Sequence, residues 1–498
     1  MRLLLTIFVF SFFGAVFIGC DSGGNSGGGF VPTGDILAVA ERAGNNQLIK
    51  VGGTQGSVPR GSTVEVTNLD TGETKTTVGL PDGSFDPTFM GSTDDTFNVL
   101  VTNNGNIVLD TIVGVTLLRN AVERNLATLG SVPVDIKIRG SRAYVINGFS
   151  NNIQVFDLNQ NPPQLLDVIV VPPGSNPISM DFLGDTQAYV ANNSGQSVAV
   201  VNIQTGACET LIVSAEDQGT TIPCETVINV PADTFEEPSG VKAANGKVYI
   251  SNNNLDENFS PNGNGFLTVL SSGTNQVLDI IDASGANTSS MTTIDDTLYV
   301  LNNGNILFDF ETFEFSCDFD FPPSIDLIDI GTDTVFDSID IPLSEQNSNV
   351  CLPNNLTATS DGFGYTGLGL VGALLKVDLF EGTVINGPDN PIIITDLTGL
   401  NNTADIAIKD GLLFTTLFNS DQVAVLDTST DQADPFPYIT PFPAGIRADD
   451  PNSQLFDGVQ SLAIRLGEPG VDFTGADIYF ITGISEQLGS VDSTLQTQ

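Results

Sequence analysis

The sequence predicts an all-β protein, and three observations lead to that prediction. Only 15% of the 498 residues are charged, against about 25% in average proteins, whereas glycine is abundant with 51 residues. Short apolar runs alternate with polar residues at every second position, as in strands that bury one face. The same short phrase also returns seven times along the chain. Together these features indicate an array of repeated strands joined by tight turns.

The repeated phrase has an aromatic residue followed by small or β-branched residues, and in several copies by asparagine. An apolar strand precedes each phrase, an alternating strand follows it, and an outer strand completes a unit with a core of about 45 residues. Four antiparallel strands in each of seven units predict a seven-bladed β-propeller over residues 122–493. We expect residues 122–129 to supply the outer strand of the last blade and close the ring. The aromatic positions are Tyr144, Tyr189, Tyr249, Tyr299, Tyr365, Phe414 and Tyr479.

Two phrases of the second unit, Ala188-Tyr-Val-Ala-Asn-Asn and Val198-Ala-Val-Val-Asn-Ile-Gln-Thr-Gly, resemble the YVTN or YncE-like repeat of bacterial and archaeal surface proteins. The resemblance covers about three quarters of the chain. It implies a propeller located at a cell surface. We interpret the blade tyrosines as packing between blades, and the Asn-Asn pairs as residues of strand ends and turns rather than as ligand sites.

The first residues resemble a bacterial lipoprotein signal peptide over residues 1–19, with Arg2, an apolar run, and Cys20 after a small residue. The apolar run of sixteen residues is shorter than the roughly 20 that a membrane span needs. We therefore expect a lipid on Cys20 and a Gly/Ser-rich tether over residues 20–34. The chain would be extracytoplasmic, on the periplasmic or cell-surface side of the bacterial envelope, with the lipid as its membrane contact. An ordinary secretory signal cut elsewhere is the alternative.

Residues 35–118 are predicted to form a small β-sandwich. Period-2 alternation on both sides of Asp70-Thr71-Gly72 indicates a hairpin, and Pro81-Asp-Gly-Ser-Phe leads into a further strand. These phrases are similar to those of bacterial immunoglobulin-like modules. The resemblance implies a spacer or stalk, with an adhesive sandwich as the alternative.

Four cysteines follow Cys20, an even number that suits disulfide bonding in an oxidising compartment. In a propeller, the loop between the second and third strands and the loop between blades emerge on the same face. Cys317 and Cys351 of the fourth unit lie in two such loops, so we expect them to form a bridge. Cys208 and Cys224 flank an insert that we assign between the third and outer strands of the second unit, and they form the other expected bridge.

Composition excludes several kinds of function. The chain has no histidine, so it cannot hold a Ser-His-Asp triad, a His-ligated zinc ion or a C-x-x-C-H haem. Its 16 basic and 60 acidic residues give a formal charge of -44, which repels phosphates and makes nucleic acid an unsuitable partner. Adaptation to a salty habitat is another explanation of this charge.

The face of the ring that carries Cys317 collects long, acidic inserts rich in phenylalanine, and we interpret it as the binding face. An alternating Phe/acid strand there is expected to turn its carboxylates to solvent. Converging oxygen ligands would suit Ca²⁺, whereas solvated acid that keeps the protein soluble is the alternative. The candidate residues are Asp256, Glu257, Asp309, Glu311, Asp318 and Asp320.

Two main classes of function remain. We favour a non-catalytic scaffold that binds an unidentified protein, glycan or cell-wall component, and we assign no catalytic residue. The alternative is a hydrolase similar to propeller lactonases, in which a divalent metal held by Asp, Glu and Asn activates water. That alternative needs carboxylates on the innermost strands, which offer Asp135, Asp181 and Asp405. A subunit of a larger electron-transfer or uptake assembly is a third option.

Overall fold

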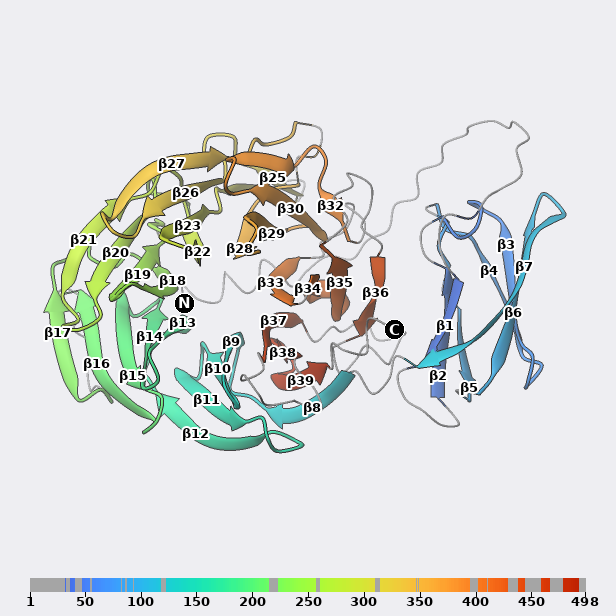
Figure 1. Ribbon diagram of the computed structural model, residues 1–498, viewed down its shortest axis with the longest axis horizontal. Helices are drawn as coiled ribbons and strands as arrows, with labels where there is room; N and C mark the ends of the chain where they lie inside the picture. The colour runs from blue at the N-terminus through green and yellow to red at the C-terminus, as the bar shows by residue number, and fades with distance from the viewer. Residues whose placement is uncertain are drawn as a thin grey trace. The chain divides into compact units, whose positions relative to one another are not determined.

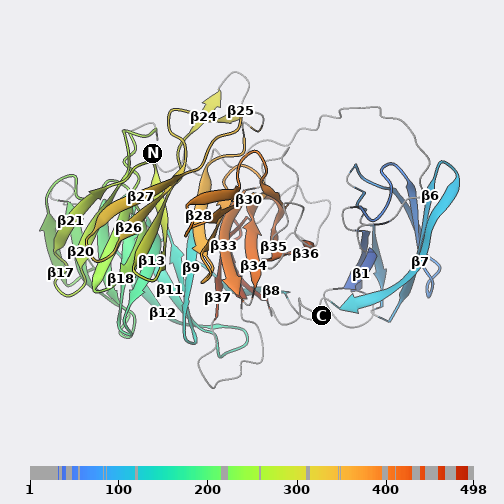
Figure 2. The same ribbon diagram turned by 45° about the horizontal axis from the view of Figure 1, so that its top comes forward.

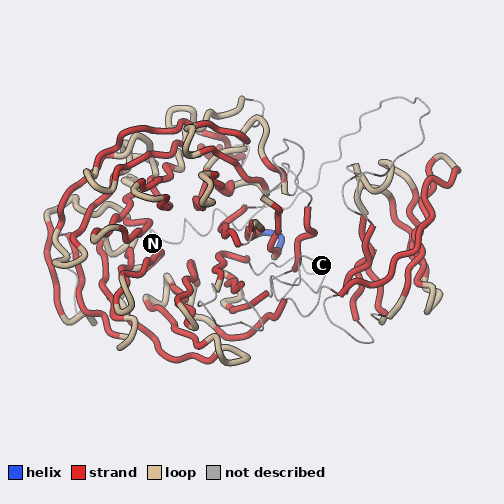
Figure 3. Tube along the Cα trace, in the orientation of Figure 1, coloured by secondary structure: helices blue, strands red, loops and turns tan. Residues whose placement is uncertain are grey.

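The computed structural model consists of β-strands and loops, with one short 3-10 turn at Phe418–Ser420 among the described residues (Figure 3). The all-β prediction is confirmed. Contacts divide the chain into two compact units, one mainly the N-terminal strands and the other mainly the repeats. Within the described part of the chain, no helix has the length and apolar character needed to cross a membrane. The described residues are 32, 36–40, 47–53, 56–81, 83–85, 87–92, 94–117, 122–214, 223–256, 260–309, 314–345, 347, 349–394, 402–409, 411–428, 438–443, 458–465 and 478–491.

The N-terminal strands form one seven-stranded sheet with the order β4-β3-β6-β7-β1-β2-β5, and Figure 1 shows it as curled. Along β3 and β6 buried residues, most of them apolar, alternate with exposed or half-buried residues, as predicted. The predicted hairpin is present, and Gly72 at its turn has φ +77°, a left-handed conformation that favours glycine. The strands are β1 (Ile36–Ala40), β2 (Gln47–Gly53), β3 (Thr63–Asn68), β4 (Thr74–Val78), β5 (Thr88–Gly91), β6 (Thr96–Asn103) and β7 (Asn106–Leu117).

These strands follow one continuous hydrogen-bonded order rather than two separate sheets. The reason is β7, a strand of 12 residues that pairs with β6 and also neighbours β1, so that it carries the sheet around the bend. The buried faces of β3 and β6 contribute Val64, Val66, Phe97 and Val99 to the core. The finer resemblance to immunoglobulin-like modules stays a prediction.

The remaining strands form seven sheets arranged as blades around a ring (Figure 1), so the predicted seven-bladed propeller is confirmed. Each blade has four antiparallel strands that begin with the innermost one, and blade 2 adds a fifth strand that pairs parallel with the fourth. Blade 1 contains β9 (Pro133–Arg139), β10 (Arg142–Asn147), β11 (Asn152–Asp157) and β12 (Gln164–Val170); blade 2 contains β13 (Pro177–Leu183), β14 (Gln187–Asn192), β15 (Ser197–Asn202), β16 (Ala207–Ser214) and β17 (Thr226–Val230); blade 3 contains β18 (Pro238–Ala244), β19 (Lys247–Asn252), β20 (Phe266–Ser271) and β21 (Val277–Asp282); blade 4 contains β22 (Thr288–Ile294), β23 (Thr297–Asn302), β26 (Ser324–Asp329) and β27 (Thr334–Asp340); blade 5 contains β28 (Pro353–Ala358), β29 (Phe363–Leu368), β30 (Ala373–Asp378), β31 (Thr383–Asn386) and β32 (Ile392–Ile393); blade 6 contains β33 (Thr403–Lys409), β34 (Leu412–Leu417), β35 (Gln422–Asp427) and β36 (Tyr438–Pro443); blade 7 contains β37 (Val459–Ile464), β38 (Ile478–Thr482), β39 (Gln487–Val491) and β8 (Val122–Thr128).

The ring closes as the sequence predicts. β8, which precedes blade 1 in the chain, pairs antiparallel with β39 and is the outermost strand of blade 7. The innermost strands of neighbouring blades touch all the way around, including β37 of blade 7 with β9 of blade 1. The last blade is therefore built from both ends of the propeller segment, which ties those ends together.

Apolar packing between blades holds the ring together. Seven clusters of buried apolar side chains occur in the described part of the ring, and each contains residues of two neighbouring blades. At the closing junction, Tyr479 and Ile481 of blade 7 pack with Ile136 and Val145 of blade 1. The predicted role of the blade aromatics in inter-blade packing is confirmed, since all seven positions are buried.

Polar groups at the same junctions add directional contacts. The hydroxyl of Tyr189 in blade 2 donates to Asn275 Oδ1 (2.5 Å) in blade 3, and that of Tyr249 in blade 3 donates to Asp333 Oδ1 (2.6 Å) in blade 4. Both acceptors lie in the turn after the third strand of the next blade. Burial, followed by Asp333, raises the pKa of Tyr249, so this hydroxyl remains a donor at ordinary pH.

Basic side chains reach the same turns of the next blade. In each case a guanidinium or ammonium group donates to the carbonyl of the residue that directly follows the third strand. The chain has few cations, and it uses several of them to join neighbouring blades. The pairs are Arg465 with Leu158 (3.0 Å), Arg142 with Ile203 (3.2 Å) and Lys247 with Ile330 (2.9 Å).

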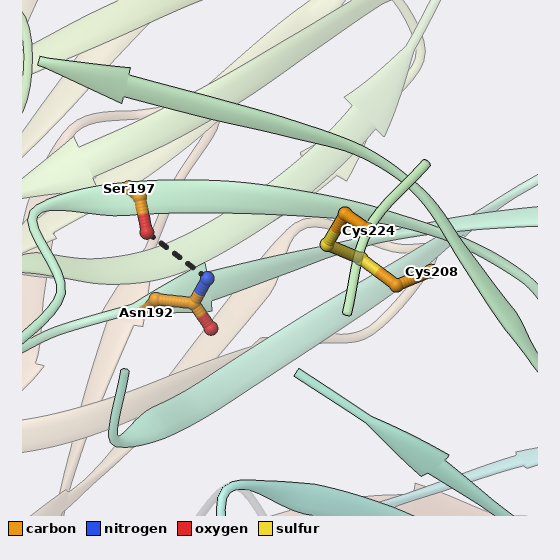
Figure 4. The surroundings of a disulfide bond; sticks show 4 residues. All are labelled: Asn192, Ser197, Cys208 and Cys224. Carbon is orange, nitrogen blue, oxygen red and sulfur yellow. Dashed lines mark hydrogen bonds between the residues drawn. A yellow bond between two sulfur atoms is a disulfide. The ribbon is translucent and has the colours of Figure 1, made fainter. Parts of the chain in front are cut away.

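Both expected disulfides are formed. Cys317, at the end of β25 (Glu314–Cys317), bonds Cys351 just before β28, with a Cα–Cα distance of 5.8 Å. Cys208 bonds Cys224 with a Cα–Cα distance of 4.5 Å (Figure 4).

The predicted place of the second bridge in its blade was wrong. Cys208 lies in β16, the fourth strand of blade 2, so the insert follows this strand instead of preceding it. After the insert, Cys224 leads into β17, a fifth strand that pairs parallel with β16. The sequence reading missed β17 because a parallel fifth strand has no counterpart in the other repeats.

We predict that Tyr249→Phe lowers the free energy of unfolding by about 1–3 kcal/mol, because the Asp333 carboxylate, which is 12% exposed, then loses a short hydrogen bond. Urea unfolding measures this loss. Tyr299→Phe is the control, since Tyr299 has the same place in blade 4 and its hydroxyl has no hydrogen bond to a described residue. Equal losses in the two variants would contradict the proposed contact.

We predict that replacing both cysteines of a bridge by serine costs more stability at Cys317–Cys351 than at Cys208–Cys224. The sequence separations are 34 and 16 residues. Chain-entropy estimates for loops of these lengths give about 4 and about 3 kcal/mol. Urea unfolding under oxidising conditions compares the two double variants with the native chain. The reverse order would show that loop closure does not control the loss.

Candidate functional site

The predicted binding-face residues do not all share one environment. Asp320 is exposed, but Asp256 is only half-buried and accepts a hydrogen bond from the backbone of Ser260. Asp309 is the last residue of β24 (Ile306–Asp309), and its side chain lies outside the described part of the structure. Glu257 and Glu311 also lie outside the described residues.

Asp318 was predicted to face solvent, and this was wrong. It is 8% exposed, and its carboxylate accepts hydrogen bonds from Asn305 Nδ2 (2.9 Å) and from the backbone N–H of Asp320 (3.0 Å). Asp318 therefore organises the turn after β25, where backbone donors would otherwise be unpaired. Alternation along the sequence could not show this, because the strand ends at Cys317, before the turn begins.

The hairpin of β24 and β25 is the most prominent described insert on the Cys317 side, and Figure 2 shows it projecting from blade 4. We call residues 303–323, which include it, the insert hairpin. The rings of Phe308 and Phe315 pack against each other across its strands in a tilted arrangement, with centroids 4.8 Å apart. Leu307 is 51% exposed and Phe319 is 54% exposed. The insert hairpin therefore combines a bridged base with exposed apolar side chains.

The asparagines at the ends of the second strands in blades 1 to 4 are fully buried. Asn192 Nδ2 donates to Ser197 Oγ (3.1 Å) in the same blade (Figure 4), and Asn302 Nδ2 donates to Asp326 Oδ2 (3.0 Å). These contacts link the second and third strands. They support the structural interpretation of the Asn positions over the ligand interpretation.

A chain of polar side chains crosses the innermost strands of blades 4 to 7 and blade 1. Ser290 Oγ donates to Asn355 Oδ1 (3.2 Å), and Asn355 Nδ2 in turn donates to Asp405. Ser461 Oγ of β37 lies 2.5 Å from Asp405 Oδ2 and 3.3 Å from Asp135 Oδ1. All five residues occupy the third position of their strands. Repetition of the blades therefore brings them together.

Asp405 is the centre of this chain. Besides Asn355 and Ser461, the backbone N–H groups of Ile406 (2.8 Å) and Leu462 (3.0 Å) donate to its carboxylate. The group is 7% exposed, and burial raises its pKa to about 6 despite the nearby Lys137. The negative charge of Asp135 also raises the pKa of Asp405, because two nearby negative charges repel each other.

Asp135 and Lys137 form an ion pair on β9. Lys137 Nζ is 3.1 Å from Asp135 Oδ2. Burial raises the pKa of Asp135, although Lys137 opposes the rise. Burial alone would lower the pKa of Lys137, but Asp135, Asp405 and Asp181 raise it overall. The lysine is 40% exposed and stays charged, which offsets part of the negative charge on the innermost strands.

The sequence correctly assigned Asp135, Asp181 and Asp405 to innermost strands. The structure brings Asp135 and Asp405 to one hydroxyl, whereas Asp181 accepts from the backbone N–H of Ala243 (2.9 Å) and lies 3.8 Å from Lys242. Sequence reasoning missed Lys137, Lys242, Asn355 and Ser461. Aligning the third and fifth positions of the innermost strands would have shown all four.

The chemistry of the donors tests whether these carboxylates fit a metal ion. The two oxygens of Asp405 already take part in four hydrogen bonds, which use about all the hydrogen-bonding positions that a carboxyl group offers. Asp135 is paired with Lys137. No group of three or more acidic or cysteine side chains suited to a metal is present among the described residues. The Asp135–Asp405 pair therefore does not fit the divalent ion of a lactonase-type hydrolase.

No family model matches the chain, and no curated protein matches its sequence. Solved structures do match the ring. The chain is similar to hydrazine synthase of Kuenenia stuttgartiensis, at 16% identity over 74% of this chain and 97% of that one, with a TM-score of 0.52. It is also similar to virginiamycin B lyase of Staphylococcus aureus, at 12% identity over 74% and 98% of the two chains, with a TM-score of 0.50. A catalytically inactive histidine-to-alanine variant of that lyase, solved with quinupristin, matches at 13% identity and a TM-score of 0.50. At these identities the likeness shows the propeller fold alone.

Proposed function

We propose that the chain is a lipid-anchored extracytoplasmic propeller that binds a protein, glycan or cell-wall component without catalysing a reaction. The observation that carries this proposal is the insert hairpin, a projecting element that a disulfide attaches to the loop before blade 5. It adds surface to blade 4 that closing the ring does not require, because β26 and β27 complete that blade.

The composition of the insert hairpin suits recognition. Leu307 and Phe319 expose about half of their side chains, and the exposed, acidic Asp320 directly follows Phe319 in the chain. Exposed apolar side chains rimmed by polar residues are a common feature of binding sites. Because Cys317 fixes the base of the insert hairpin, less conformational entropy is lost when a partner binds.

Enzymatic alternatives have less support. A lactonase-type hydrolase needs carboxylate oxygens free to hold a metal, whereas both oxygens of Asp405 are already engaged in hydrogen bonds. A lyase of the virginiamycin B type is also a poor candidate: its histidine-to-alanine variant is catalytically inactive, and this chain has no histidine.

The location in the proposal depends on the signal-like residues 1–19 and Cys20, which lie outside the described residues. The two disulfides add support, because such bonds persist mainly in oxidising compartments. The acidic ring itself gives no reason for attachment to anionic lipids. A lipid on Cys20 would therefore supply the membrane contact.

We predict that Leu307→Ser combined with Phe319→Ser weakens binding to the envelope ligand by at least roughly tenfold, because exposed apolar anchors dominate such interfaces. Binding is measured with peptidoglycan sacculi, a glycan array and separated envelope proteins. Leu278→Ser combined with Ile280→Ser, on the exposed outer strand of blade 3, is the matched control. Equal weakening in both variants, or lactone hydrolysis that a chelator abolishes, would contradict the proposal.

We predict that Cys20→Ser moves the protein from the membrane fraction to the soluble fraction, because it removes the acylated thiol. Detergent phase partition measures the shift, and mass spectrometry of the N-terminal peptide detects the lipid. Cys208→Ser combined with Cys224→Ser is the control, since this change leaves Cys20 in place. Unchanged membrane association of the Cys20 variant would contradict the anchor but not the binding role of the insert hairpin.

A further inference from the structure

One hydroxyl separates two carboxyl groups where the ring closes. Ser461 belongs to blade 7, whereas Asp405 belongs to blade 6 and Asp135 to blade 1. All three residues are at most 9% exposed. Their contacts therefore cross both junctions of the blade that closes the ring, in a place from which water is largely excluded.

The number of hydrogen atoms available for the two contacts of Ser461 limits how these contacts can form. Ser461 has a single hydroxyl hydrogen, so it can donate to Asp405 or to Asp135 but not to both. If both carboxyls are ionised, one of the two oxygen contacts has no hydrogen between its atoms. If Asp405 keeps a proton, it donates to Ser461 Oγ, and the hydroxyl of Ser461 donates to Asp135. Every contact then has its hydrogen.

We propose that the ring of this protein closes around one proton shared by Asp135 and Asp405 through Ser461, and that loss of this proton loosens blade 7. The shared proton makes closure of the ring sensitive to pH. The device uses three side chains from three blades, so it acts on the junctions of blade 7 rather than within one sheet.

The other groups around the pair modify this behaviour without removing it. Lys137 on β9 faces both carboxyls and compensates one negative charge. On β28, Asn355 is neutral and donates to Asp405. The next charges along the innermost strands, Asp181 and Lys242, lie close to each other. One positive charge therefore serves two carboxylates when both are ionised, which leaves one negative charge in excess.

The direction of the effect follows from the raised pKa of Asp405, about 6 against an ordinary 3.8. A carboxyl whose pKa is higher in the folded state stabilises that state fully below pH 4, and the stabilisation is lost as the pH rises through about 6. One proton changes the unfolding constant by up to tenfold per pH unit. Opening of blade 7 should therefore become up to roughly 100-fold easier between pH 4 and pH 7.

Hydrogen exchange of the full chain between pH 4 and pH 8, corrected for the intrinsic pH dependence of exchange, tests the proposal. The peptides that contain β37 and β38 report on blade 7, and the N–H of Leu462 is itself a donor to Asp405. We expect the protection of these peptides against exchange to fall as the pH rises through about 6. The protection of β18, the innermost strand of blade 3, should change less. A flat profile for β37 in the native chain would overturn the proposal.

Variants separate the shared proton from the general charge of the chain. Asp405→Asn should abolish the step near pH 6, and Asp135→Asn should move it to lower pH because the repelling charge is gone. Asp181→Asn is the control, since it removes one carboxylate from an innermost strand but makes no contact with Ser461. If Asp405→Asn does not fold, the pH profile of hydrogen exchange in Asp135→Asn decides whether the proton is shared. A step that is unchanged in either Asp405→Asn or Asp135→Asn, or equally reduced in Asp181→Asn, would contradict the shared proton.

Discussion

The structure of the ring depends on packing between neighbouring blades. A four-stranded blade has two faces and cannot bury both within itself, so it is stable only when a neighbour covers each face. The seven buried clusters meet this need, because each one joins two blades. Closure through β8 adds to this packing, because it completes the sheet of blade 7 with a strand from the other end of the propeller segment.

The same constraint explains where the few cations lie. A chain with a formal charge of -44 repels itself, and each Lys or Arg stabilises it most where it meets partially negative groups of another blade. Arg142, Lys247 and Arg465 reach carbonyl groups of the next blade, and Arg139 pairs with Asp185 of blade 2. These cations thus reinforce the apolar junctions between blades.

Most of the fold could be predicted from the sequence, because repetition makes a weak local signal strong. One phrase such as Tyr-Val-x-Asn says little, but seven related phrases with an aromatic residue at the same place predict the number of blades, the closing strand and the Cys317–Cys351 bridge. Features that occur once could not be read in this way. Among the described blade strands, β17 alone pairs parallel with its neighbour, and Asp318 is buried by a turn whose geometry the alternating pattern does not contain. The sequence indicated that Asp135 and Asp405 lie on innermost strands. Their meeting at Ser461 depends on how blades 6, 7 and 1 are placed in space.

The hydrogen bonds of the innermost strands also bear on where a partner can bind. In the described part of the ring, several polar groups of the innermost strands bond one another: Asp405 makes four hydrogen bonds, and Asp135 pairs with Lys137. A ligand at these groups would have to replace hydrogen bonds that hold blades together, and would lose the free energy that those bonds contribute. Binding at the insert hairpin would break no hydrogen bond between blades, because blade 4 is complete without it. Loops on a rigid scaffold can therefore vary and bind without cost to the ring, which favours the insert hairpin over the centre as the surface for a partner.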